Sequence, residues 1–270
     1  MKLLIAATLF SSMANATEQE CSLNFQDDLM ISSQQAQLLR ADKPVWQINQ
    51  QGELYLQGKQ VDTDAQTRQQ LQQYQAGLHH NAQQTVVLVA DALDLASTAI
   101  NRVFTEFDID ASTAKAKIDS ALDNMRRNTE QVVLTQGDNI HIYGSKFSQI
   151  DAGFEDELSS AIDSSVQEIA GHVLMKVGQA MASNDGTLEM KMTEFGEKMD
   201  KFGKELEAEL AGKAKQLESR GQQICSNMAA LNTLEQQIQQ KIPAMQEFDL
   251  IKTGEEVAAK QDGKNLTLKF

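Results

Sequence analysis

The sequence predicts an α+β protein that is mostly α, with a small N-terminal antiparallel β meander followed by long amphipathic helices packed as an elongated bundle. Over residues 21–61, apolar and polar side chains alternate as in half-buried strands, and from residue 64 onward apolar residues recur every three or four positions, as in helices. Two prolines and an apolar content of 41% favour long helices around a buried core. The chain therefore divides into a signal peptide (1–16), the meander (17–62), a helical region (63–252) and a polar tail (253–270).

The meander begins at Cys21, which shares its strand face with Leu23 and Phe25. Its clearest hairpin is the segment 44–61, PVWQINQQGELYLQGKQV. Apolar residues alternate with polar ones on both sides of Asn49-Gln50-Gln51-Gly52, which has the composition of a turn. We therefore expect a small antiparallel meander.

The helical region is expected to begin at Asp64. Residues 85–104, TVVLVADALDLASTAINRVF, are apolar on more than one side, which suits a helix buried in the middle of a bundle. The β-branched residues of segment 85–89 also permit a strand, but the helical spacing continues to Phe104 and favours the helix.

Two further helices and a second hairpin are expected in the middle of the chain. One helix runs from Ser112 into residues 125–130, and a short hairpin follows near 132–143 with Gly137-Asp138 at its turn. The next helix is expected to be capped by Asp151 and to end near 183–186.

The longest element predicted is a helix over residues 188–242, which ends before Pro243. Its apolar residues are spaced by four and three, with one stutter at Leu210. Glycines leave open whether the helix is continuous, and its apolar stripe would either pack within a monomer or pair two copies as a coiled-coil homodimer. The tail after residue 252 is polar, and its segment NLTLKF would either add an edge strand or be disordered.

The first residues have the anatomy of a secretory signal peptide. Lys2 precedes a short apolar run, and Ala14-Asn15-Ala16 places small side chains where a signal peptidase reads them. We expect cleavage between Ala16 and Thr17, so that the protein is exported.

The two cysteines are predicted to form a disulfide. Export places them in an oxidising compartment, and an even number of cysteines favours pairing. Cys225 flanks the apolar stripe of the longest helix, and Cys21 lies on the apolar face of its strand. A Cys21–Cys225 bridge would tie the first strand to the last helix, and the alternative is two buried free thiols.

Charge and motifs exclude several classes of function. A net charge of −14 repels nucleic acids and anionic lipids, and charged residues interrupt the most apolar segment, so no transmembrane span is expected. No nucleophile elbow, phosphate loop or HExxH motif is present. Adjacent His79 and His80 lack the spacing of zinc ligands and are expected at the surface. The sequence nominates no catalytic, cofactor-binding or metal-binding residue.

Two functional hypotheses remain. The first is a non-enzymatic protein with an interaction or envelope-maintenance role, whose partner is a protein or an envelope component. Methionine-rich helix faces suit adaptable apolar contacts, and the residues concerned are Met181, Met190, Met192 and Met199. The alternative is a hydrolase or ligand-binding protein acting on an envelope component. It predicts a concave pocket with converging carboxylates or His141, and clustering of His141 with Trp46, Tyr55 and Tyr143 would favour it.

Four segments within residues 21–251 carry a resemblance to a known family, namely CSLNF, WQIN, LYLQGK and QQICSNMAALNTLEQQIQQKIPAMQEFDLI. Through them the chain resembles the YggN-like family of proteobacterial periplasmic proteins of unknown function. The resemblance implies a periplasmic location and a single unit in which strands precede helices. It brings no catalytic or binding residues.

Overall fold

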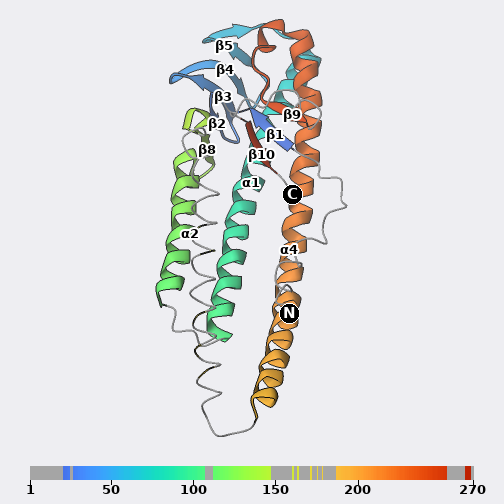
Figure 1. Cartoon of the computed structure of the whole chain (residues 1–270). Helices are drawn as coiled ribbons and strands as arrows, with labels where there is room; N and C mark the ends of the chain where they lie inside the picture. Colours follow the sequence, from blue (N-terminus) through green and yellow to red (C-terminus); the bar gives the residue numbers. More distant parts are fainter. Residues whose placement is uncertain are drawn as a thin grey trace.

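The computed structural model describes residues 21–24, 27–106, 112–146, 187–253 and 265–268, with five further helical residues at 160, 163, 171, 175 and 178. Figure 1 shows an elongated molecule in which the β-sheets lie at one end and the long helices run away from them. The described part is an α+β fold dominated by helix, as the sequence predicts.

The larger sheet has seven strands, all joined by antiparallel pairing in the order β6-β5-β4-β3-β2-β8-β7. Its strands are β2 (Asp28–Ile31), β3 (Gln35–Arg40), β4 (Lys43–Asn49), β5 (Leu54–Leu56), β6 (Lys59–Val61), β7 (Val133–Gln136) and β8 (Asn139–Ile142). Both predicted hairpins are present. The second hairpin adds to the edge of the meander, with Leu29 opposite Ile142, a pairing that the sequence did not indicate.

One face of this sheet forms the core. Leu29 and Ile31 of β2 are buried while Met30 between them is 37% exposed, as the two-residue period of a strand requires. The same alternation holds on the neighbouring strands, where the buried residues include Ala36, Leu38, Trp46, Ile48, Leu54, Ile140 and Ile142. The buried face packs against the helices, and the centroid of the Trp46 ring lies 6.5 Å from that of Tyr74.

The first strand belongs to a second, three-stranded sheet and not to the meander, which corrects the sequence prediction. Strand β1 (Cys21–Asn24) lies between β9 (Ile251–Thr253) and β10 (Asn265–Leu268), antiparallel to both. The edge of β2 that β1 would need is occupied by β8. The segment NLTLKF therefore contributes a strand, which was one of the two outcomes left open for the tail.

Three long helices are described, and each begins close to its predicted start. They are α1 (Ala65–Glu106), α2 (Ser112–Val132) and α4 (Leu188–Lys241). The Asp64 carboxylate caps α1 by accepting a 2.7 Å hydrogen bond from the Thr67 N–H, and this bond lowers the pKa of Asp64. Helix α4 is continuous over 54 residues and is followed by the turn of 3₁₀ helix Pro243–Met245. The helix predicted from Asp151 to 183–186 lies largely outside the described residues.

Helices α1 and α4 are antiparallel and pack closely. Contacts join Tyr74 to Glu235, Asp91 to Arg220, and Arg102 to Glu209, so residue numbers fall on α4 as they rise on α1. At Gly77 a methyl group would lie 2.5 Å from the Leu231 side chain, so glycine permits this close approach. The apolar stripe of α4 is therefore used within the molecule, at least over this part of its length.

The outer surface of the described helices carries exposed methionine side chains, and no described helix is a candidate membrane span. Met190 is 64% exposed and Met199 is 40% exposed, while Met181 and the side chain of Met192 lie outside the description. Within the described ranges, none of the helices combines the length and hydrophobicity needed to cross a bilayer.

Gly52 closes the turn between β4 and β5 and contacts helix α1. Its φ of +73° lies in the left-handed region that glycine adopts without strain. The Asn49 side chain accepts hydrogen bonds from the N–H groups of Gln51 and Glu53 at 3.0 and 2.9 Å. A Cβ at position 52 would overlap the carbonyl oxygen of Arg68, so this turn fixes the sheet against α1.

We expect Gly52→Ala to destabilise the protein by roughly 3 kcal/mol, because it adds backbone strain and a clash with Arg68. The matched control is Gly58→Ala, which shares a positive φ of +78° but has open space around the added methyl group, and it should cost only about 1 kcal/mol. Urea unfolding of both variants measures the difference. Equal losses in the two variants would contradict the role of the Arg68 contact.

Candidate functional site

A cavity of about 490 Å³ lies where the larger sheet meets the helices. Its walls come from β2, β7 and β8 of the sheet, from α1, α2 and α4, and from the segment that enters β9. This volume falls within the range of ~300–1,000 Å³ that small-molecule sites occupy.

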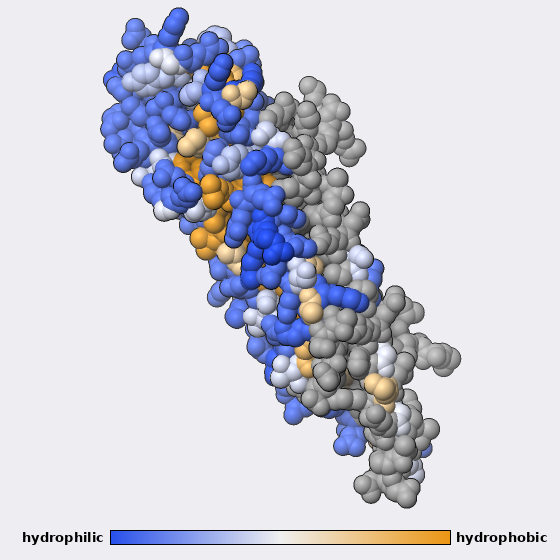
Figure 2. All heavy atoms as spheres, turned by 90° about the vertical axis from the view of Figure 1, so that its left-hand side faces the viewer, coloured by the Kyte–Doolittle hydropathy of each residue, from blue (hydrophilic) through white to orange (hydrophobic). Residues whose placement is uncertain are grey.

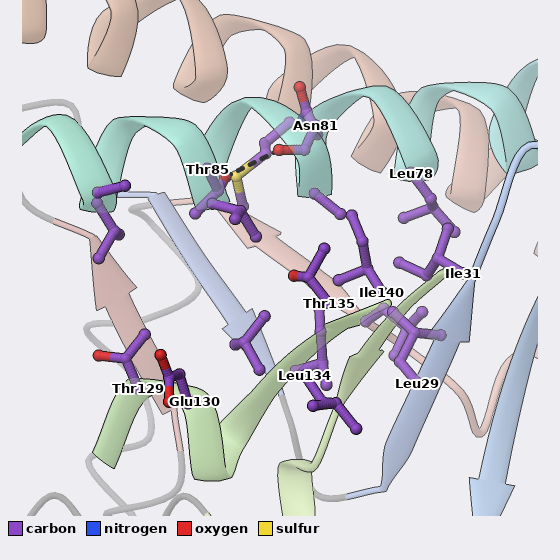
Figure 3. Close-up of a pocket in the computed structure, with 18 of the residues that line it drawn as sticks. Leu29, Ile31, Leu78, Asn81, Thr85, Thr129, Glu130, Leu134, Thr135 and Ile140 are labelled. Atoms are coloured by element: carbon purple, nitrogen blue, oxygen red, sulfur yellow. Dashed lines mark hydrogen bonds between the residues drawn. The ribbon is translucent and has the colours of Figure 1, made fainter. Parts of the chain in front are cut away.

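Most of the cavity wall is apolar. Figure 3 shows Leu29, Ile31 and Ile140 on the strands and Leu78 on α1 around a common space. The remaining apolar wall residues are Ala82, Val86, Val89, Ala90, Leu93, Val133, Leu134, Ile142, Met228, Leu231, Leu250 and Ile251. Such a wall can desolvate a hydrocarbon group but offers few partners to a charged one.

The cavity opens on the side of α2 and the β7–β8 hairpin. On this face Figure 2 shows apolar atoms reaching the surface in a band bordered by hydrophilic atoms. Leu134 of the wall is 36% exposed. The charged wall residues are Asp94, Arg126 and Glu130, and an ion pair of 3.1 Å joins Arg126 to Asp94. Both partners of this pair are substantially exposed, so they lie at the rim.

Asn81 is a buried polar residue in this wall. It is 6% exposed, and neither its side-chain nitrogen nor its side-chain oxygen has a hydrogen-bond partner among the described residues. It lies one helical turn after Gly77, on the side of α1 that faces α4. One turn further on, the Thr85 hydroxyl donates to the Asn81 backbone carbonyl at 2.9 Å, as Figure 3 shows.

Glu235 fixes the chain segment that closes the cavity from the α4 side. Its side chain is buried, with the residue 3% exposed, and accepts hydrogen bonds from the Tyr74 hydroxyl at 2.7 Å and from the N–H groups of Leu250 and Ile251 at 3.1 and 3.2 Å. Burial raises the pKa of Glu235 to about 7, although these three hydrogen bonds oppose the shift. Leu250 and Ile251 in turn line the cavity.

Both buried polar residues interrupt apolar stripes that the sequence displays. Asn81 takes the next position in the series Leu71, Tyr74, Leu78, and Glu235 takes a position in the series Ile224, Met228, Leu231, Ile238. A polar residue within such an apolar series is the signal from which both positions could have been found.

The predicted cysteine pair is described only in part. Cys225 of α4 is 2% exposed, and the backbone of Cys21 pairs with Thr253 at the end of β9. The side chain of Cys21 and the predicted cleavage site at Ala16 and Thr17 lie outside the described residues. The bridge and the cleavage remain predictions.

The expectation that both adjacent histidines are surface residues is wrong for His79. Its side chain is 13% exposed and lies 3.0 Å from an oxygen of Asp138, so it links α1 to the β7–β8 turn, whereas His80 is exposed. Among the described residues, no three His, Cys, Asp or Glu side chains are grouped as metal ligands.

The aromatic cluster that would favour a hydrolase or ligand-binding protein does not include Trp46. His141 lies on the outer face of the sheet, since it pairs with Met30 between the buried Ile140 and Ile142, whereas Trp46 lies on the inner face. The His141 ring instead stacks on Tyr143 at 3.8 Å, and burial lowers its pKa. His141 is also absent from the cavity wall.

The fold and site define a mostly helical α+β protein with an apolar cavity at the junction of sheet and helices. The chain belongs to the family described as "Protein of unknown function (DUF2884)", which matches residues 21–251. It is 21% identical over 218 residues to "Uncharacterized protein YggN" of Escherichia coli strain K12, across 76% of this chain and 91% of that protein. The proteins of the same name from Escherichia coli O6:H1 and O157:H7 show the same identity and coverage. No solved structure matches the chain significantly.

Because the pKa of Glu235 rises from 4.5 to about 7 on folding, stability should fall as the pH rises between these values. In this window the folded protein keeps a proton that the unfolded chain has released. The stabilisation is fully present below about pH 4.5 and is lost as the pH rises through about 7, a change on the order of 3 kcal/mol.

We expect Glu235→Gln to remove this pH-dependent stabilisation. The free energy of unfolding of the variant should then fall less between pH 5 and pH 8 than that of the unmodified protein. Urea unfolding of both proteins at both pH values checks this. The contributions of the other carboxylates are the same in the two proteins and cancel when their pH dependences are compared. Glu207→Gln, at an exposed position of α4, is the matched control and should behave as the unmodified protein. An unchanged pH dependence in Glu235→Gln would contradict the assignment.

Proposed function

We propose that this protein is an exported, non-enzymatic binding protein of the periplasm that holds a single hydrocarbon chain in the cavity between the sheet and the helices. The observation that carries the proposal is the cavity itself, about 490 Å³ in volume and lined mostly by aliphatic side chains. It is roughly three times the size of a ~150 Å³ apolar protein cavity that binds benzene.

The energetics suit a chain of about ten methylene groups. Burial contributes roughly 0.8 kcal/mol per methylene group, or about 8 kcal/mol for ten, before the costs of immobilisation are subtracted. Preformed walls keep those costs low, since Leu29, Ile31 and Ile140 are already 2–3% exposed without ligand. Since about 8 kcal/mol corresponds to a Kd of roughly 1 µM, the remaining costs make an affinity weaker than micromolar the expected result.

Binding without catalysis is supported by the distribution of reactive groups. The carboxylates in the wall are Asp94 and Glu130, and Asp94 is paired with Arg126 at the exposed rim. The Thr85 hydroxyl donates to a backbone carbonyl, and His141 lies on the opposite face of the sheet. Among the described wall residues, the apolar interior thus offers a hydrocarbon chain contact area and no paired acid and base.

Export and the Cys21–Cys225 bridge are part of the same proposal. Strand β1 pairs with β9, and both contact α4, the helix that carries the buried Cys225. A bridge there would hold β1 and β9 against α4, beside Leu250 and Ile251 of the cavity wall. An oxidising compartment such as the periplasm would allow it to form.

We expect Val86→Trp to weaken binding of the fluorescent apolar probe N-phenyl-1-naphthylamine at least tenfold, because Val86 lines the cavity and the larger ring would occupy it. Val87→Trp is the matched control, since Val87 is 48% exposed and does not belong to the wall. Fluorescence titration measures both, and decane should displace the probe. Equal affinities in the two variants, or no binding to the unmodified protein, would contradict the proposal.

We expect protein isolated from a periplasmic extract to begin at Thr17 and to contain no free thiol. Intact mass should show loss of residues 1–16, and alkylation under denaturing, non-reducing conditions should add nothing until a reductant is present. Cys225→Ser is the control, because its remaining Cys21 should be alkylated without reduction. An untrimmed chain with two alkylated cysteines would overturn this part of the proposal.

A further inference from the structure

We infer that the ligand is a single-chain amphiphile that enters the cavity tail first, so that its terminal methyl group lies beside Leu78 and its polar headgroup beside the Asp94–Arg126 ion pair; this inference rests on the proposed function. The ligand class is therefore narrower than a hydrocarbon, because the molecule carries a polar group at one end and none at the other.

The first argument is the shape of the cavity. Its wall on α1 runs from Leu78 to Asp94, and Asp94 lies 16 positions after Leu78 in the sequence. A helical segment of this length spans about 24 Å. Aliphatic wall residues recur along it every three or four positions, as on one helix face, at Leu78, Ala82, Val86, Val89 and Leu93. A cavity that follows one helix face over this length suits an extended chain that lies along α1.

The second argument is that one end of the cavity is buried and aliphatic. Leu78 shares this end with Ile31 and Ile140, which face each other across β2 and β8, and all three are 2–6% exposed. On the α4 side, Leu231 is also buried and approaches α1 at Gly77. A hydroxyl or charged group placed among these side chains would lose its hydration, and they offer it no hydrogen bond in return.

The third argument is that the other end is polar and open to water. The side chains of Asp94 and Arg126 form the 3.1 Å ion pair there and are 77% and 45% exposed. Figure 3 shows Thr129 and Glu130 on the side of the cavity opposite Leu78. A headgroup at this end keeps its hydration while the tail fills the interior. The contrast between the two ends therefore fixes the direction of the chain.

The first test compares 1-decanol, 1,10-decanediol and decane as competitors of N-phenyl-1-naphthylamine, using the full exported chain. We expect decanol to bind about as tightly as decane, because its hydroxyl stays at the open end. Decanediol should bind roughly tenfold or more weakly than decanol, because its second hydroxyl must enter the aliphatic end. Equal affinities for decanol and decanediol would overturn the inference and leave the proposed function intact.

A pair of variants on α1 locates the aliphatic end. Leu78→Ser introduces a hydroxyl there, and should reduce the preference for decanol over decanediol to about a third or less of its original value. Leu93→Ser is the matched control at the open end and should leave this preference unchanged. The preference is a ratio of two affinities within one protein, so a general loss of stability does not alter it. The same change in both variants, or a change in Leu93→Ser alone, would overturn the inference.

A second measurement needs no variant and decides the question if Leu78→Ser does not fold. In isotope-filtered NOE spectra of the unmodified protein with decanol, the terminal methyl protons of the ligand should contact the methyl groups of Leu78 and Ile31. The protons beside the hydroxyl should contact Leu93 and Thr129. Contacts in the reverse order, or both ligand ends contacting both sets, would overturn the inference alone. Failure of decane, decanol and decanediol alike to displace the probe would overturn the proposed function as well.

Discussion

The buried carboxylate of Glu235 joins three elements that are distant in the sequence. It accepts a hydrogen bond from Tyr74 of α1, it belongs to α4, and it accepts two further bonds from the backbone that leads into β9. These bonds replace water at two backbone N–H groups, so the carboxylate helps to set where the segment crosses the helix pair. The position of β9 then fixes the smaller sheet, since β1 pairs with it, and places Leu250 and Ile251 in the wall of the cavity. The antiparallel helices, the second sheet and the cavity all depend on this one group.

The cavity lies between two packed regions of the hydrophobic core. Close to β9, Gly77 lets α1 and α4 touch, and the core is continuous there. Further along, α1 still contacts α4 and also packs on α2 through a separate cluster of Phe104, Ile118 and Leu122. Between these two packed regions, Ala82, Thr85 and Val86 of α1 line the cavity together with residues of the β7–β8 hairpin. Space remains where neither cluster extends, and the proposed ligand would complete the core at that place.

Local features of the fold were predictable, and long-range ones were not. The turn at Asn49–Gly52, the start of α1 next to Asp64 and the end of α4 before Pro243 each follow from residues within one turn of one another, and all three were predicted. The pairing of Leu29 with Ile142 and of Cys21 with Thr253 joins strands more than a hundred residues apart, and strand periodicity carries no information about the partner. The cavity could not be predicted because it depends on those pairings. In the sequence, Asn81 and Glu235 are visible only as polar positions within apolar series. Their surroundings could not be predicted: the Asn81 side chain has no hydrogen-bond partner among the described residues, whereas the Glu235 carboxylate accepts three hydrogen bonds.

The antiparallel partnership of Cys21–Asn24 with Asn265–Leu268 brings the opening and closing strands of the described chain together. Contacts at so large a sequence separation raise the contact order, and sheets built from them form slowly. During translation β1 leaves the ribosome more than two hundred residues before β9 and β10, so neither of its neighbours exists when it emerges. The first of the described strands to be synthesised must therefore wait for two of the last ones before it can pair.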